Sequence, residues 1–427
     1  MVLKKWRFFR NSGLSTKGLW IIFSIKLGAG LFLTWVYSSY YTNRLEADIF
    51  KYFDDSEVMY NALASKPVDF FKMLFSIGND TEYFFKTYYV EMNNWDPIYD
   101  TNAYNDSHTI IRANALIRIF SMGNFYIHTL AFTSLSMIGL TALFRSFKNL
   151  FQNKKGALAI VIFLIPSVLF WSSGALKESI LLFGMGVLIY SLNKLTENRL
   201  SIKHYIYFVL SFALLFYIKF YVLLALAPCI LGFIIVVKFK IKYPLAVYLS
   251  VVLFSSILAF NSDKIPPHFD FVETMVRKQK DFIRLAEVTE PGSRFELTKL
   301  EPTFIGIIKV VPEAVLNCFI RPLPQKGNRL IYLPSIVENI TILLALFLAL
   351  FSVIKKKVTL TWEAKNMFWF SLVFTLLLFT IIGLTTPVSG ALVRYKVPAL
   401  PFLGIVILFY LNFDYFTEKY SFLKFLK

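Results

Sequence analysis

Long apolar runs recur along the whole chain, and they constrain its fold more than any other feature. Several approach the roughly 20 residues that a helix needs to cross the hydrocarbon core of a bilayer. Only 17% of the 427 residues are charged, against about a quarter in an average soluble protein. Because unpaired backbone groups are costly in hydrocarbon, such runs cross membranes as helices. The sequence therefore predicts an all-α polytopic membrane protein.

About ten transmembrane helices are predicted from these runs. Residues 1–427 are expected to form a single transmembrane domain, with two large loops at residues 39–123 and 261–332. The predicted spans lie near residues 19–38, 124–145, 157–173, 175–193, 204–218, 220–237, 243–260, 333–354, 366–385 and 397–414.

Charge separates the loops between these spans into two sets. The loops that share a side with the N-terminus hold close to half of the 45 Lys and Arg residues and very few acids, whereas loop 39–123 carries 12 acids against 7 basic residues. Because basic residues in short loops mark the cytoplasmic side, both termini are predicted inside and both large loops outside. The net charge of +18 then reflects topology and contact with lipid headgroups, not nucleic acid. A composition rich in Phe and Lys favours a bacterial inner membrane, with the two large loops on its periplasmic side.

The first large loop opens with an acidic stretch from Asp48 to Glu57. Read as a helix, it places Asp48, Lys51 and Asp55 on one face and apolar residues on another. Two further amphipathic segments follow, so the loop is predicted to contain juxtamembrane helices lying on the outer leaflet. The second large loop is also predicted to contain such helices. Solvation alone would explain an acidic surface helix, and catalysis by its carboxylates is the alternative.

Basic residues that belong neither to the inner segments nor to the two large outer loops gather at the outer ends of the predicted spans. Charges this close to hydrocarbon are costly unless they are paired or used. Lysines beside the exposed N–H groups of a helix start form a natural phosphate site, although interfacial anchors have the same appearance. The candidate residues for an anionic headgroup, with the acids beside them, are Lys177, Glu178, Lys219, Arg321, Glu338, Arg394 and Lys396. Lys26, inside the first span, is expected to snorkel to the inner surface.

Two motifs resemble those of the GT-C superfamily of integral-membrane glycosyltransferases. Tyr52-Phe-Asp-Asp-Ser-Glu57 stands where that family places an acidic motif, in a long first outer loop directly after the first span. Arg394-Tyr-Lys-Val-Pro-Ala-Leu-Pro401 is similar to the Arg-Tyr-x-x-Pro-x-x-Pro-like stretch that such enzymes often carry before a late span. The resemblance implies a transferase that moves a sugar from a polyprenyl-phosphate-linked donor to a glycan, lipid or protein acceptor outside the membrane.

The resemblance also implies roles for the candidate residues. Asp54 or Asp55 is expected to deprotonate the acceptor hydroxyl as general base, with Asp48 as a stand-in or metal ligand. The cations are expected to stabilise the departing phosphate, Lys177, Arg394 and Lys396 before Lys219 and Arg321. No cofactor is certain. A divalent cation, Mg²⁺ or Mn²⁺, is left open, with Asp48, Asp54 or Asp55 as its ligands.

Other functions remain open at this stage. An O-antigen-type polysaccharide polymerase or ligase has a similar number of spans and would rely on Arg321 and Arg394 without a carboxylate of the first loop. A lipid or solute transporter is the alternative from another class, although internal repeats and midplane charges are not apparent. The sequence contains no P-loop, GxSxG or HExxH motif. Cys229 and Cys318 indicate neither a disulfide framework nor a metal cluster.

Overall fold

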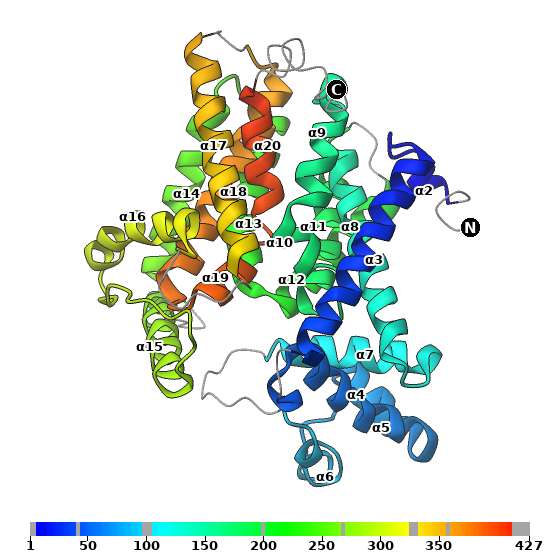
Figure 1. The fold of residues 1–427 in the computed structure, drawn as a ribbon. Helices are drawn as coiled ribbons and strands as arrows, with labels where there is room; N and C mark the ends of the chain where they lie inside the picture. Colours follow the sequence, from blue (N-terminus) through cyan, green and yellow to red (C-terminus); the bar gives the residue numbers. More distant parts are fainter. Residues whose placement is uncertain are drawn as a thin grey trace. The chain divides into compact units, whose positions relative to one another are not determined.

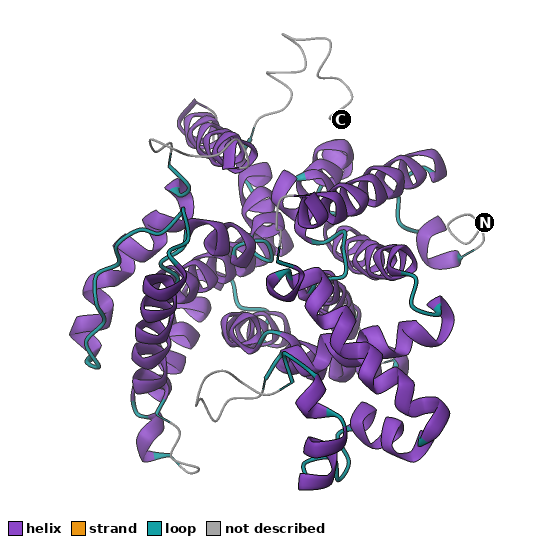
Figure 2. Ribbon diagram, turned by 60° about the horizontal axis from the view of Figure 1, so that its bottom comes forward, coloured by secondary structure: helices purple, strands orange, loops and turns teal. Residues whose placement is uncertain are grey.

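The computed structural model describes residues 6–39, 43–95, 105–197, 201–265, 270–323, 332–355 and 359–411. Within these ranges the chain is helical, and the only β pairing is an isolated bridge between Arg294 and Val388 (Figure 2). The α-helices of the N-terminal half are α2 (Arg7–Arg10), α3 (Thr16–Ser39), α4 (Asp48–Ser65), α5 (Pro67–Phe75), α6 (Glu82–Thr87), α7 (Ser107–Ser121), α8 (Phe125–Phe147), α9 (Lys155–Ala159), α10 (Pro166–Trp171), α11 (Lys177–Thr196) and α12 (Ile202–Ile218). Those of the C-terminal half are α13 (Phe220–Lys238), α14 (Pro244–Phe260), α15 (Phe271–Thr289), α16 (Phe304–Ile320), α17 (Leu333–Lys355), α18 (Trp362–Thr385), α19 (Ser389–Tyr395) and α20 (Leu400–Tyr410).

Six of these helices are long and apolar enough to cross a membrane, namely α3, α8, α11, α13, α17 and α18. Helices α19 and α20 meet at 67° and supply a seventh span if the bent pair is counted as one. The predicted fifth and seventh spans coincide with the shorter apolar helices α12 and α14. The predicted third span is interrupted, because a π-helical turn, η4 (Ile160–Leu164), lies between α9 and α10. The architecture is consistent with an all-α polytopic membrane protein, and the count of ten spans stays a prediction.

The chain forms two compact units that are built from alternating stretches of sequence. The first comprises Met1–Ser146, Leu169–Ser191 and Ser201–Phe220, and the second comprises the remaining residues, including Tyr221–Lys427. The candidate site residues therefore fall into two groups, those up to Lys219 in the first unit and those from Arg321 onward in the second.

In the first unit, apolar packing seats the start of α4 on the end of α3. The buried cluster that does this consists of Leu33, Tyr37, Ala47, Ile49, Phe50 and Leu176. Helix α4 then packs along α7, which runs across the end of α8 (Figure 1). The predicted helices of the first loop are confirmed as α4, α5 and α7. Because Leu176 directly precedes α11, this packing brings the first turn of α4 beside the first turn of α11.

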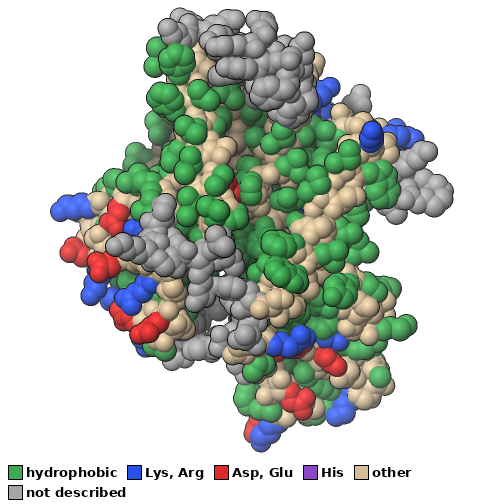
Figure 3. Space-filling view, in the orientation of Figure 1, with side chains coloured by type: hydrophobic (Ala, Val, Ile, Leu, Met, Phe, Trp, Pro, Cys, Tyr) green, Lys and Arg blue, Asp and Glu red, His purple; other side chains and the backbone are tan. Residues whose placement is uncertain are grey.

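In the second unit, α18 packs against α14, α16 and α20. The charged helix α15 lies over a buried apolar cluster that includes Val276, Val310 and Leu384. Hydrophobic side chains cover the visible surface of α17, whereas charged side chains gather around α15 (Figure 3). Exposed apolar residues along a long helix are expected where lipid, not water, is the solvent.

Two glycines of α3 provide a matched test of this packing. A Cβ atom on Gly30 would lie 1.9 Å from the carbonyl oxygen of Ser173, whereas a Cβ on Gly28 would meet nothing within 4 Å. Because overpacking a tight contact typically costs about 1–3 kcal/mol, Gly30→Ala should lower the melting temperature of the purified protein. Gly28→Ala should leave it unchanged or raise it slightly, since Ala favours helix. Equal melting temperatures for the two variants would contradict this close contact.

Candidate functional site

Six charged side chains of the first unit form a group of ion pairs in which two lysines lie over the ring of Tyr52, and we call this group the Tyr52 cluster. It consists of Asp48, Lys51, Asp106, Lys177, Glu178 and Lys219. Lys51 Nζ lies 2.7 Å from Asp48 Oδ1, and Lys177 Nζ lies 2.6 Å from Asp106 Oδ1. Lys219 Nζ lies 3.9 Å from Glu178 Oε1. The Nζ atoms of Lys51 and Lys177 lie 5.1 and 4.7 Å from the centre of the Tyr52 ring. Four predicted site residues, Asp48, Lys177, Glu178 and Lys219, are thus brought together.

Helix ends position the members of this cluster. Lys177 and Glu178 form the first turn of α11, Lys219 is the residue that ends α12, and Asp106 directly precedes α7. Asp48 opens α4, whose apolar neighbours Ile49 and Phe50 are buried. Charged residues stand at helix ends here because the helix interiors are committed to apolar packing.

Burial differs sharply within the Tyr52 cluster. The side chains of Lys177, Lys219 and Glu178 are 7%, 8% and 1% exposed, whereas those of Asp48 and Asp106 are 24% and 39% exposed. Burial opposes the charge of Lys51, but the Asp48 carboxylate outweighs it and raises the pKa of that lysine. A buried charge is tolerated when a partner of opposite charge accompanies it. The cluster therefore has a buried cationic floor and two carboxylates that reach solvent.

Asp55, one of the two favoured bases, has a carboxylate that is bound by a loop. Its carboxylate is buried and accepts hydrogen bonds from the backbone N–H groups of Asn93 at 3.0 Å and Asn94 at 2.9 Å. The side-chain amide of Asn94 donates a third bond at 2.9 Å. Burial raises the pKa of Asp55, and these three bonds oppose the rise. The contacts describe a carboxylate that holds a loop against α4, not one that is open to a substrate hydroxyl.

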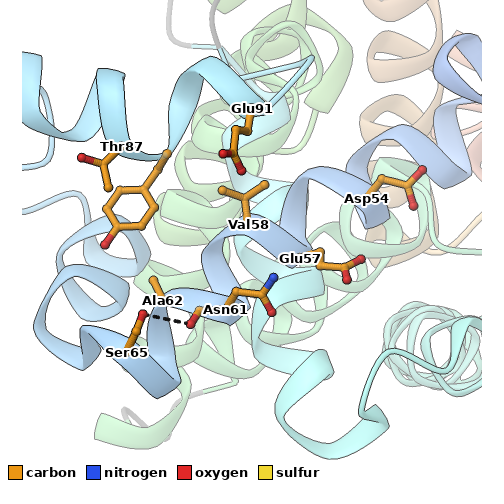
Figure 4. A pocket seen from close by; sticks show the side chains of 9 residues that line it. Asp54, Glu57, Val58, Asn61, Ala62, Ser65, Thr87 and Glu91 are labelled. Atoms are coloured by element: carbon orange, nitrogen blue, oxygen red, sulfur yellow. Dashed lines mark hydrogen bonds between the residues drawn. The ribbon is translucent and has the colours of Figure 1, made fainter.

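Asp54 lies on another face of α4 and is bound by Arg44. The guanidinium donates from Nε and a terminal nitrogen to the two carboxylate oxygens, at 2.8 and 2.7 Å. Asp54 also lines an open groove of about 380 Å³ between α4 and the segment around η2 (Tyr89–Glu91), drawn in Figure 4. The other residues that line it are Glu57, Val58, Asn61, Ala62, Ser65, Thr87, Tyr88 and Glu91.

The three predicted metal ligands do not fit a cation. Asp54 is committed to Arg44, Asp55 to three N–H donors and Asp48 to Lys51. Among the described residues, no three His, Cys, Asp or Glu side chains are arranged to hold a metal ion.

The candidates of the second unit form a separate group. Lys396 lies in the bend between α19 and α20, where its Nζ donates to Asn339 Oδ1 at 2.5 Å and to the Cys318 carbonyl at 3.4 Å. Glu338 accepts from the backbone N–H of Ser167 at 2.6 Å and from its hydroxyl at 2.9 Å. Lys396 and Glu338 are both buried and attract each other electrostatically.

Asn339 connects this group to Arg321, since its amide donates to the Arg321 carbonyl at 2.7 Å. The guanidinium of Arg321 lies 3.9 Å from the centre of the Phe295 ring. Burial lowers the pKa of Arg321, but an arginine remains charged in proteins. Arg394 stands half-buried on α19, two residues before Lys396.

The prediction that Lys26 snorkels to the surface is wrong. Lys26 is fully buried in α3, and its Nζ donates to Ser172 Oγ at 2.7 Å, Ser173 Oγ at 3.2 Å and the Ser172 carbonyl at 3.4 Å. The side chain turns toward this serine turn because the turn packs directly against α3 at Gly30. Lys26 thereby clamps the turn that leads into Lys177.

Neither the ion pair of Asp106 nor the contact of the Tyr52 ring with Lys177 can be recognised in the sequence. Asp106 closes a polar, turn-rich passage and reads locally as an ordinary helix cap. Tyr52 reads as one more aromatic residue on an amphipathic helix. Only the partner across space, Lys177, distinguishes either residue from its neighbours.

Comparison with known proteins adds no relative. No protein-family model, no curated protein and no solved structure matches this chain.

Asp54 and Asp55 are adjacent, so substitution separates their roles. Asp55→Ala removes the buried carboxylate that accepts from the N–H groups of Asn93 and Asn94, which costs about 1–3 kcal/mol and should lower the melting temperature. Asp54→Ala breaks an exposed ion pair of about 0–1 kcal/mol and should leave melting nearly unchanged. Thermal melting of the purified variants in detergent measures both effects. A stable Asp55→Ala protein would contradict the anchoring role.

The surroundings of His108 predict that the stability of the protein depends on pH. Its ring stacks on Trp95 at 4.0 Å and shares a hydrogen bond with the Trp95 carbonyl. Burial lowers the pKa of His108 from 6.5 to about 4, and the Arg112 charge adds to this effect. The neutral ring therefore contributes stability that is fully present above pH 6.5 and is lost as the pH falls through about 4.

His108→Phe keeps a ring for stacking but cannot titrate. Between pH 7 and pH 4, the melting temperature of the wild-type protein should fall more than that of the variant. The difference should correspond to a loss of roughly 3 kcal/mol in the free energy of unfolding. Parallel pH profiles for the two proteins would show that His108 does not control this loss.

Proposed function

We propose that this protein is a membrane glycosyltransferase that acts on a polyprenyl-phosphate-linked sugar. The observation that carries the proposal is the Tyr52 cluster, where buried lysines and half-exposed carboxylates meet at the start of a membrane-length helix. Lys177 and Lys219 suit the phosphate of a lipid-linked donor, because their charges are desolvated and strong. This chemistry agrees with the resemblance of the Tyr52–Glu57 and Arg394–Pro401 motifs to GT-C enzymes. We further propose that the cluster faces the periplasm in a bacterial inner membrane, with both termini in the cytoplasm.

Asp48 is the general base that we propose. Its side chain is 24% exposed and Lys51 contacts its Oδ1 at 2.7 Å, whereas Arg44 binds both carboxylate oxygens of Asp54. Asp48 takes the proton as the acceptor oxygen bonds to the anomeric carbon and the bond from that carbon to the phosphate oxygen breaks. The phosphate leaves with the electron pair, and the lysines stabilise its charge. The acceptor is a glycan, a lipid or a protein.

The second unit favours two alternatives. Arg321 on Phe295 and Arg394 on α19 suit an O-antigen-type polymerase or ligase, which needs no carboxylate from α4. The bent pair α19–α20 with the buried Lys396 favours a lipid or solute transporter, because such proteins bind substrate at broken helices that carry intramembrane charges.

Release of polyprenyl phosphate from a lipid-linked sugar pool tests the proposal. The full chain in lipid nanodiscs should release it, and Asp48→Asn should slow release about a hundredfold or more, the usual loss for a general base. Lys177→Gln should also slow release. Asp54→Asn, the matched control on the same helix, should retain most of the rate.

Each other outcome has a definite meaning. Full activity of Asp48→Asn with loss in Asp54→Asn or Asp55→Asn would return the base to the acidic pair. Full activity of Asp48→Asn with loss only in Arg394→Ala would favour the polymerase or ligase. The absence of any release from wild-type protein across donor sugars would overturn the glycosyltransferase.

A further inference from the structure

The charges of the Tyr52 cluster balance, and this creates a problem for anion binding. Three lysines face three carboxylates, so the named groups carry no excess positive charge. A phosphate that approached Lys177 would meet an ammonium group that already has Asp106 Oδ1 at 2.6 Å. A phosphate at the same ammonium group would lie close to the Asp106 carboxylate, and the two negative charges would repel each other. For an anion to bind there, one carboxylate has to withdraw.

Asp106 is the carboxylate best placed to withdraw. Its side chain is 39% exposed, compared with 24% for Asp48 and 1% for Glu178. It makes no capping hydrogen bond to α7, although it stands at the N-cap position. That task falls to Asn105, whose Oδ1 accepts from the Ser107 backbone N–H at 3.0 Å. The start of α7 is therefore capped by Asn105 and not by the Asp106 carboxylate.

The position that Asp106 occupies has the properties of an oxyanion site. Lys177 Nζ also donates to the hydroxyl of Ser107 at 3.2 Å, so an ammonium group and a hydroxyl converge there. The Tyr52 ring lies against the same ammonium group, and Lys219 lies close enough to Lys177 to interact with it electrostatically. Short contacts between an ammonium group and a carboxylate have the same geometry as its contacts with a phosphate oxygen.

We infer that the Asp106 carboxylate occupies the phosphate-oxygen position of the substrate at Lys177 and is displaced when an anionic headgroup binds. The inference rests on the proposed function for its substrate class, a phosphate monoester or diphosphate. No covalent bond changes in this step, because one oxyanion replaces another at the ammonium group. Asp106 then swings toward solvent, which its exposure allows. The carboxylate acts as an internal competitor that keeps the site neutral until the substrate arrives.

Binding measurements test this inference without requiring catalysis. The full chain is placed in phosphatidylcholine nanodiscs, and binding of polyprenyl phosphate and of inorganic phosphate is measured in separate arms. Asp106→Asn should bind the anion about tenfold more tightly, as expected when a site that is competent about a tenth of the time becomes open. Lys177→Gln should bind it roughly ten- to a hundredfold more weakly, since it loses a charged hydrogen bond.

Two further variants guard against trivial explanations. Asp106→Glu keeps the negative charge and should stay close to wild type, which separates charge removal from a disturbed fold. Glu82→Gln removes an exposed acid of the same unit, paired with Lys86 at 2.6 Å, and should change affinity little. A gain in affinity for both probes would identify the phosphate group as the recognised feature, and a gain for polyprenyl phosphate alone would identify the lipid headgroup.

Weaker or unchanged anion binding in Asp106→Asn would overturn the inference and leave Asp106 as a structural partner of Lys177. This outcome is distinct from failure of the proposed function. A protein that binds polyprenyl phosphate more tightly in Asp106→Asn, but transfers no sugar from any donor, would support the displaced carboxylate and reject the glycosyltransferase.

Discussion

The free-energy cost of holding an ammonium group away from water organises both units. Lys26, Lys177 and Lys396 are all buried, and each reaches a polar partner far along the chain. Lys26 binds the serine turn 146 residues away, Lys177 binds Asp106 71 residues away, and Lys396 binds Asn339 57 residues away. Because an unpartnered charge in such a place would be prohibitive, these contacts specify how the helices meet. The tight backbone approach at Gly30 then becomes necessary, since it lets Lys26 reach its acceptors.

Full pairing has a consequence for function. A site in which each cation has a carboxylate is stable without its substrate, whereas a bare group of lysines at the start of a membrane helix would be costly. The same pairing reduces the attraction for a phosphate, so binding requires that one internal partner gives way. Asp106 stands at the more exposed edge of the Tyr52 cluster, while Glu178 remains as a buried counter-charge. Stability of the resting protein and affinity for an anion are therefore opposed at one side chain.

Sequence patterns located the helices of the first loop, whereas only the structure gives the surroundings of their acids. Amphipathic spacing located α4, α5 and α7, because a period of 3.6 residues is a local property. The same spacing placed Asp48, Lys51 and Asp55 on one face, yet their surroundings differ. Asp55 meets the N–H groups of Asn93 and Asn94, from a turn with no recognisable pattern. Asp48 contacts Lys51 through Oδ1 and keeps 24% of its side chain exposed, and this exposure makes it the stronger candidate base.

The sequence by itself determined that the chain is helical and apolar, and that charged candidates stand near helix ends. These properties follow from composition and periodicity, which act over a few residues. Only the tertiary structure decided which charges meet, because contacts such as Lys177 with Asp106 depend on how α3, α4, α7 and α11 pack. It also divided the candidate residues between two units and buried Lys26, which local sequence placed at a surface. The physical reason is that charge pairing acts across space, while sequence patterns report neighbours along the chain.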